Sequence, residues 1–406
     1  MTAKTHHWVR FSLLNLFIVA VLGALMRYKI GFELPIFEQK YLQEAHSHFA
    51  FAGWITHTLY FLLVRTFRSG LPQINEVAYQ RLIGVNLFSA YGMLVCFFIQ
   101  GYGPVSLAFS TLSVLTGYVF SWHALRDAGR LAPDHPGKNW IRAALWFGIL
   151  STLGTMVLSW MMASHHYNQN TYLGSIYFYL HFQYNGWFLF ACIGIFMDSI
   201  KGFNLDKKAV RYSFLLFALA AIPAYFLSTL WAHLPAWLYA LVVIAAISQV
   251  AGWWFLVKLI RQNLDPLKTA FNKIVRLLFL VVALALTLKL VLQLGSTIPG
   301  VSKLAFGFRP IVIAYLHLVL LVIISGFLLA FMFGNQMIRP NRTARLALLV
   351  FTTGAILNES VLAVQGIFSF SYTVVPLANE MLFGIAVVLM SGAAMLLASQ
   401  IKLAEN

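Results

Sequence analysis

The chain has 406 residues, of which 60% are apolar and only 10% are charged, and its formal net charge is +16 at pH 7. This composition and a mean hydropathy of +0.79 exclude an ordinary soluble domain, because apolar runs of about 20 residues recur and each can span a bilayer. The basic residues flank these runs, so nucleic acid is not an expected partner. Only Cys96 and Cys192 are present, which excludes a disulfide framework and a covalent haem-attachment motif.

The apolar runs predict an all-α fold, a polytopic bundle of twelve transmembrane helices that forms a single membrane domain over 1–406. In chain order the predicted spans are 11–29, 42–66, 81–101, 104–126, 141–163, 170–199, 210–232, 235–260, 273–294, 309–333, 344–366 and 374–400. The connections are short and leave no room for a soluble domain.

Basic residues mark one side of the predicted bundle. Lys4 and Arg10 precede the first span, and further clusters follow the second, fourth, sixth, eighth and tenth spans: Arg65, Arg68, Arg81; Arg126, Arg130, Lys138, Arg142; Lys201, Lys207, Lys208, Arg211; Lys258, Arg261, Lys268, Lys273, Arg276; Arg339, Arg342, Arg345. The connections after spans three, five, seven and eleven carry none. The positive-inside rule then predicts cytoplasmic termini, with the bacterial inner membrane as the expected location and its lipid bilayer as the main partner.

Histidines are the most informative polar residues in the spans. Those expected toward the outer face are His46, His48, His165, His166, His181, His233 and His317. A polar ring at bilayer depth costs free energy unless it is hydrogen-bonded, lines water or binds a metal. We therefore expect haem or metal ligation by at least two of His46, His48, His181 and His317, with His165 and His166 as loop residues. His46 and His48 point about 200° apart on a helix, so only one of them can ligate a given ion.

His57 lies near the middle of the second span, three turns below His46. A histidine in a membrane bundle commonly hydrogen-bonds to a neighbouring helix. We expect that structural role for His57.

The segment from His46 to Trp54, His-Ser-His-Phe-Ala-Phe-Ala-Gly-Trp, resembles the H-x-H-x-x-x-x-G-W motif of haem-copper oxidase catalytic subunits, especially the high-affinity C-family, and of the related nitric oxide reductases. The helix around His181 resembles the one that supplies the first ligand of the non-haem copper or iron. Residues 231–237 resemble the W-x-G-x-P stretch, and His317 falls where the family's low-spin haem ligand stands.

This resemblance implies a fold like subunit I of the haem-copper oxidases, and at least one haem b. Its axial ligands would be His317 and either His46 or His48, and copper or non-haem iron would lie at His181 and His233. An electron-donor cytochrome or quinol and further membrane subunits are the implied partners. The function implied is electron transfer or chemistry on oxygen or nitric oxide.

The sequence departs from the family at its reducing centre. Alignment on Trp231 and Pro235 puts Leu227 and Ser228 where the family has two adjacent histidines, and Tyr315 stands where the high-spin haem's ligand would be. We therefore expect an incomplete binuclear centre and an oxidoreductase of weak or absent turnover.

Four further polar residues are candidates for the same site. Lys289, Glu359 and Tyr315 are the catalytic candidates, although structural ion pairs are the expected role of Lys289 and Glu359. Arg309 can bind haem propionates, because a guanidinium matches a carboxylate bidentately.

Two alternatives stay open. The NnrS-type nitric-oxide-response membrane proteins, which are non-enzymatic haem and copper proteins, also carry an H-x-H-x-x-x-x-G segment early in the chain. A plain membrane transporter is the other alternative, and a haem spectrum would exclude it.

Overall fold

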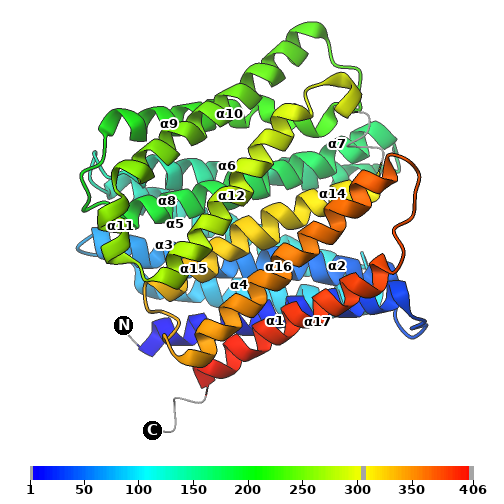
Figure 1. Cartoon of the computed structure of the whole chain (residues 1–406), viewed down its shortest axis with the longest axis horizontal. Coiled ribbons are helices and arrows are strands. Elements are labelled where there is room, and N and C mark those ends of the chain that lie inside the picture. The colour runs from blue at the N-terminus through cyan, green and yellow to red at the C-terminus, as the bar shows by residue number, and fades with distance from the viewer. Residues whose placement is uncertain (1–2, 303–307, 402–406) are drawn as a thin grey trace.

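The computed structural model describes residues 3–302 and 308–401, and throughout these ranges the regular elements are helices. Both termini lie at one end of the helix bundle, which we call the terminal side, and the opposite end is called the far side (Figure 1). Helices α3, α8, α11 and α15 end toward the terminal side, so the basic connections gather there.

The elements follow one another with short connections. They are α1 (Ala3–Gly31), α2 (Gln39–Phe49), η1 (Ala50–Thr56), α3 (His57–Gly70), α4 (Glu76–Gln100), α5 (Pro104–Arg130), α6 (Lys138–Ser164), α7 (Gln169–Leu180), η2 (His181–Phe188), α8 (Leu189–Ser199), α9 (Lys207–Ala221), η3 (Pro223–Thr229), α10 (Ala236–Gln262), α11 (Leu264–Ala270), α12 (Lys273–Gly295), α14 (Arg309–His317), η4 (Leu318–Ser325), α15 (Gly326–Gly334), α16 (Arg342–Ser369) and α17 (Ala378–Ile401).

Among the described residues, nine helices are long and apolar enough to cross a membrane, or ten if the bent pair α9 and η3 forms one span. The expectation of an integral multi-pass membrane protein is thereby confirmed. Two further helical stretches, 39–70 and 169–199, are continuous but do not belong to these nine. They contain His46, His48, His57 and His181, whose polarity lowers the hydropathy of both stretches.

Several helices begin where the sequence places an asparagine or aspartate. Each of these side chains accepts a hydrogen bond from a backbone N–H of the first turn, which satisfies a donor that the helix itself cannot use. The capping residues are Asn75, Asn168, Asp206, Asn272 and Asn341.

The predicted seventh span, 210–232, is broken. Helix α9 ends at Ala221, the 3₁₀ segment η3 starts at Pro223, and the two are bent by 48°. Proline has no N–H to donate and its ring clashes with the preceding turn, so a straight helix cannot continue through Pro223. The predicted span is therefore bent at Pro223, and the count of twelve spans stays a prediction.

Three segments have the wider turn of a π-helix: η1, η2 and η4. They begin two residues after His48, at His181, and directly after His317. In a π-helix the N–H bonds to the carbonyl five residues back, and such turns are frequent at functional sites. The three π segments therefore lie in the predicted spans that contain His46 and His48, His181, and His317.

Side chains from neighbouring helices hold the first π segment. The amide nitrogen of Asn86 in α4 donates to the carbonyl of Ala52 at 3.1 Å, and that of Asn15 in α1 donates to the carbonyl of Gly53 at 2.5 Å. Trp54 Nε1 donates to Ser325 Oγ in η4 at 2.8 Å. Segment η1 is thus held by hydrogen bonds to α1, α4 and η4.

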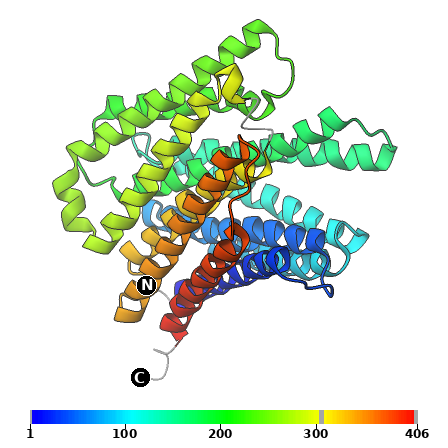
Figure 2. The same ribbon diagram turned by 45° about the vertical axis from the view of Figure 1, so that its right-hand side comes forward.

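Helices α14 and α15 run between the N-terminal helices and the α9–α10 pair (Figure 2).

Candidate functional site

His46 and His48 face different parts of the bundle. The Nδ1 atom of His46 lies 3.1 Å from the carbonyl oxygen of Val19 in α1. The ring of His48 stacks on Phe97 with 4.1 Å between centroids, and its Nε2 lies 2.9 Å from the hydroxyl of Tyr102. The divergence that helical geometry predicts for this pair is present, and it turns His48 toward the end of α4.

His317 lies at the end of α14, and its Nδ1 is 2.9 Å from the carbonyl oxygen of Ile313. His317 is also close enough to His46 for the two rings to interact electrostatically. The structure therefore brings together His46 and His317, two of the predicted ligands, and not His48 and His317.

Both rings have the same hydrogen-bonding pattern. A carbonyl oxygen can only accept, so in His46 and in His317 the hydrogen must be on Nδ1. The Nε2 atom of each neutral ring then carries a lone pair, and in neither ring does it make a hydrogen bond to the residues described. A backbone carbonyl on Nδ1 is the usual partner that orients a metal-ligating histidine.

Helix α14 offers space beside these rings. None of its residues from Arg309 to His317 is buried. On the other side, His46 packs over Gly23 of α1, where an added Cβ would lie 3.4 Å from its Cε1 atom. Protein side chains therefore do not enclose α14 at this level, which fits a flat prosthetic group between α2 and α14.

Arg27 is a site residue that the sequence analysis missed. Its guanidinium interacts electrostatically with His46 and His317, and also with Arg309 and Glu359. An arginine in the last turn of the first span, on the side without basic clusters, was the signal available. Arg27 is thus a charged group that interacts with both ligand candidates, His46 and His317.

Arg309 and Glu359 lie near Arg27 at this site. Arg309 Nη2 donates to Gln43 Oε1 of α2 at 3.4 Å. Glu359 Oε1 accepts from Asn358 Nδ2 at 3.0 Å and interacts with Arg27. The guanidinium groups of Arg27 and Arg309 interact with each other, and Glu359 is a carboxylate that interacts with Arg27. A ligand that carries carboxylates would suit this pair of guanidinium groups.

Both ring nitrogens of His181 make hydrogen bonds within the protein. Its Nε2 donates to the carbonyl of Ala221 at 2.8 Å, and its Nδ1 accepts from the amide of Asn185 at 3.2 Å. His233 is exposed in the connection between η3 and α10. Within the ranges described, no group of three or more His, Cys, Asp or Glu side chains could hold a metal ion. The second metal site at His181 and His233 stays a prediction.

Tyr315 and Lys289 lie on the His181 side. The rings of Tyr315 and Tyr184 have centroids 6.3 Å apart, and Tyr315 also lies near Asn185. Lys289 is buried in α12 and interacts electrostatically with His181. Lys289 forms no ion pair with Glu359, so these two residues do not pair with each other.

The other histidines have separate surroundings. His57 is fully buried beside Trp8 and Phe61, and it interacts with the backbone of Trp8 in the neighbouring helix α1. His165 and His166 lie at the exposed end of α6 and in the following connection, as loop residues should.

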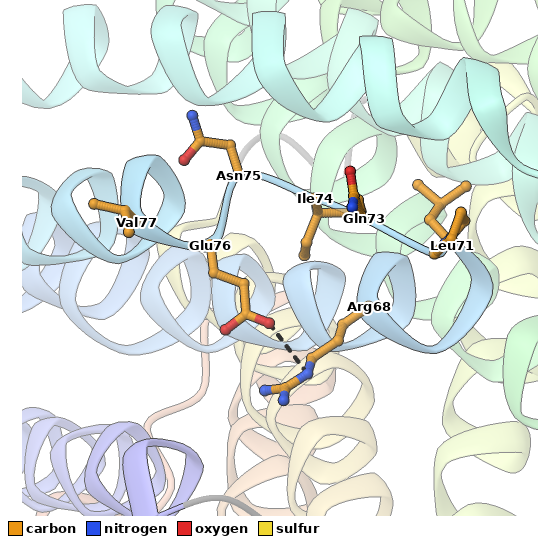
Figure 3. Close-up of a pocket in the computed structure, with 8 residues that line it drawn as sticks. Arg68, Leu71, Gln73, Ile74, Asn75, Glu76 and Val77 are labelled. Carbon is orange, nitrogen blue, oxygen red and sulfur yellow. Dashed lines mark ion pairs between the residues drawn. The ribbon is translucent and has the colours of Figure 1, made fainter.

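Two open hollows lie elsewhere and contain none of the predicted site residues. The larger, of about 630 Å³, is lined by the connection between α3 and α4, and its main polar feature is the Arg68–Glu76 ion pair at 3.2 Å (Figure 3). The smaller, of about 220 Å³, is lined by one face of α10, including Trp254, Lys258 and Arg261. Neither combines groups that would carry out chemistry.

No protein-family model matches this chain, and no curated protein matches it either. The assignment of a function therefore rests on the geometry of the His46–His317 site.

Proposed function

We propose that this protein is a haem-binding integral membrane protein of the haem-copper oxidase type, which transfers electrons and has an incomplete reducing centre. The observation that carries this proposal is the matched state of His46 and His317. Each donates Nδ1–H to a backbone carbonyl, and each keeps an Nε2 lone pair that no described group uses. Two such rings, near each other and on different helices, are what a bis-histidine haem requires.

The chain's own residues fit the needs of the group. His46 of α2 and His317 of α14 would hold haem b from its two faces, and haem supplies one-electron redox chemistry when it is bound. Arg27 and Arg309 would neutralise its propionates, because the two guanidinium groups are close enough to interact with each other. Because histidines would hold the haem from both faces, a diatomic gas would find no open position, so we propose electron transfer rather than gas reduction.

The rest of the proposal concerns the membrane. The two polar helical stretches 39–70 and 169–199 and the bent pair α9–η3 would complete twelve spans. The basic terminal side would face the cytoplasm of a bacterial inner membrane. A quinol or a cytochrome would supply electrons, and further membrane subunits would be partners.

A second candidate is a non-enzymatic haem protein of the NnrS type, which responds to nitric oxide. One observation favours it over an enzyme: both nitrogens of His181 are hydrogen-bonded within the protein, so His181 is not free to ligate copper or non-haem iron. Nitric oxide binding to the reduced protein, without consumption, separates this candidate from a reductase.

The experiment is an optical and metal analysis of the purified protein and of three variants. We expect the wild type to show a sharp reduced α-band of low-spin haem b, and His46→Ala and His317→Ala to lose it. His48→Ala is the matched control, because His48 lies two residues from His46 and faces Phe97 and Tyr102. A haem-free wild type, or loss of the band in His48→Ala with retention in His46→Ala, would overturn the proposal.

A further inference from the structure

Helix α10 ends in a stripe of polar and aromatic side chains that lines the smaller of the two hollows. The residues of this stripe are Trp254, Val257, Lys258, Arg261 and Gln262. They follow the spacing i, i+3, i+4, i+7 and i+8, so they share one face of the helix. Trp254 is 61% exposed, and Lys258 and Arg261 are exposed as well. The stripe is therefore open to the surroundings of the protein.

The opposite face of α10 packs against the rest of the bundle. A Cβ added at Gly252 would lie 2.8 Å from the ring of Phe217 in α9, and the buried residues Leu256 and Leu259 continue this face. Successive residues of a helix point about 100° apart, so this face lies opposite to Trp254 and Arg261. Because α10 is one of the helices long and apolar enough to cross a membrane, the stripe faces lipid.

The stripe reaches the level of the lipid headgroups. Helix α10 has 27 residues. At 1.5 Å per residue it is about 40 Å long, whereas the hydrocarbon core of a bilayer is about 30 Å thick, so its ends extend into the headgroup layers. The short helix α11, which follows directly, lies on the basic terminal side (Figure 1). Trp254 lies two turns before Arg261, and tryptophan is typical of the boundary between acyl chains and headgroups.

The two cations of the stripe have no carboxylate beside them. In the described part of the chain, neither Lys258 nor Arg261 forms an ion pair or a side-chain hydrogen bond. The cation at the larger hollow differs, because Arg68 is paired with Glu76 at 3.2 Å. Of these two hollows, the one on α10 therefore offers cations that can bind an anion.

The chemistry of the stripe matches one class of ligand. Lysine and arginine bind phosphate groups, and basic sites at the membrane surface bind anionic headgroups. The apolar surfaces of Trp254 and Val257 suit the glycerol and the first acyl carbons of a lipid, which a free phosphate lacks. A choline headgroup would bring its own cation close to Lys258 and Arg261. We propose that this stripe binds one anionic phospholipid, with the phosphate at the two cations and the glycerol on Trp254.

Native mass spectrometry tests this site, with the full chain released from nanodiscs that contain equal amounts of phosphatidylglycerol and phosphatidylcholine. We expect the most tightly held lipid to be phosphatidylglycerol. The double variant Lys258→Gln with Arg261→Gln should lose this preference. Each cation near a membrane surface strengthens anionic lipid binding about fivefold, so the preference should fall about 25-fold. Both side chains are exposed, so their replacement leaves the packing of α10 intact.

The matched control is Arg342→Gln with Arg345→Gln. These arginines are exposed, have the same i, i+3 spacing at the start of α16, and line neither hollow. This control should keep the preference of the wild type. Lys258→Arg with Arg261→Lys should keep it too, because both charges remain. No preference in the wild type, or equal effects of the two glutamine double variants, would overturn the proposal.

Fluorescence quenching tests the position of the lipid. Brominated phosphatidylglycerol should quench the tryptophan fluorescence more strongly than brominated phosphatidylcholine, and Trp254→Phe should remove most of this difference. An excess of inorganic phosphate should leave the quenching unchanged, because phosphate lacks the apolar part of the ligand. Displacement by phosphate would identify a site for a soluble anion, and an undiminished difference in Trp254→Phe would place the lipid elsewhere. Either result would refute the proposed lipid site, and neither depends on bound haem.

Discussion

Asn15 joins two helices to the first π segment, and its removal should be measurable as lost stability. The side chain is fully buried in α1, its amide donates to the carbonyl of Gly53 at 2.5 Å, and its Oδ1 accepts from the hydroxyl of Tyr91 in α4 at 2.8 Å. Asn15→Ala deletes both hydrogen bonds. At about 0.5–1.5 kcal/mol each, the loss is about 1–3 kcal/mol of unfolding free energy.

The assay is equilibrium unfolding of the purified protein in mixed micelles of a mild detergent and sodium dodecyl sulfate, followed by tryptophan fluorescence. Tyr91→Phe removes only one of the two bonds and should cost about half as much. The double variant should cost less than the sum of the single ones, because the two residues share a bond. Thr111→Val is the control, since its exposed hydroxyl bonds only to Leu107 of its own helix. An unfolding free energy for Asn15→Ala equal to that of Thr111→Val would refute the reasoning.

Two glycines give further predictions, with Gly84 as a shared control because nothing lies within 4 Å of a Cβ added there. A Cβ at Gly154 would lie 2.5 Å from the backbone oxygen of Ser175, so Gly154→Ala must move α6 away from α7. We expect this variant to lose about 1–3 kcal/mol of unfolding free energy in the same assay. Gly84→Ala should show no comparable loss of unfolding free energy. Gly23→Val should crowd the ring of His46, so we expect this variant to retain less haem than the wild type through detergent washing. If Gly23→Val and Gly84→Val retained the same amount of haem, the proposed position of the His46 ring would be contradicted.

The ends of several helices could be predicted because the end of an apolar run and the capping residue both lie within a few residues of the helix end. The span predicted over 273–294 is α12, Lys273–Gly295, which Asn272 caps through Val275 N–H at 3.1 Å. The span predicted over 309–333 is the continuous helix Arg309–Gly334. The bend at Pro223 was also readable in principle, since proline interrupts a helix by its own covalent structure.

The site was only partly predictable. Helical periodicity states that His46 and His48 diverge, but it does not tell which of them faces His317, because that depends on how α2 packs against α1. Arg27 acquires its role only from neighbours that are remote in sequence. The carbonyl that occupies Nε2 of His181 belongs to Ala221, 40 residues away, so no local pattern could exclude His181 as a ligand.

The hydrogen bonds of the first π segment cannot all form at the same time during synthesis. Its bonds to Asn15 and Asn86 come from the first hundred residues, so they can form as soon as α4 has entered the membrane. The bond from Trp54 to Ser325 spans 271 residues, and at about 5–20 residues per second its acceptor is made roughly 15–50 s later. Until then the indole N–H must be solvated by water or lipid headgroups. The N-terminal helices can therefore pack together before α14 and α15 are synthesised. The His46–His317 pair can form only after α14 has been made, so it assembles late in biogenesis.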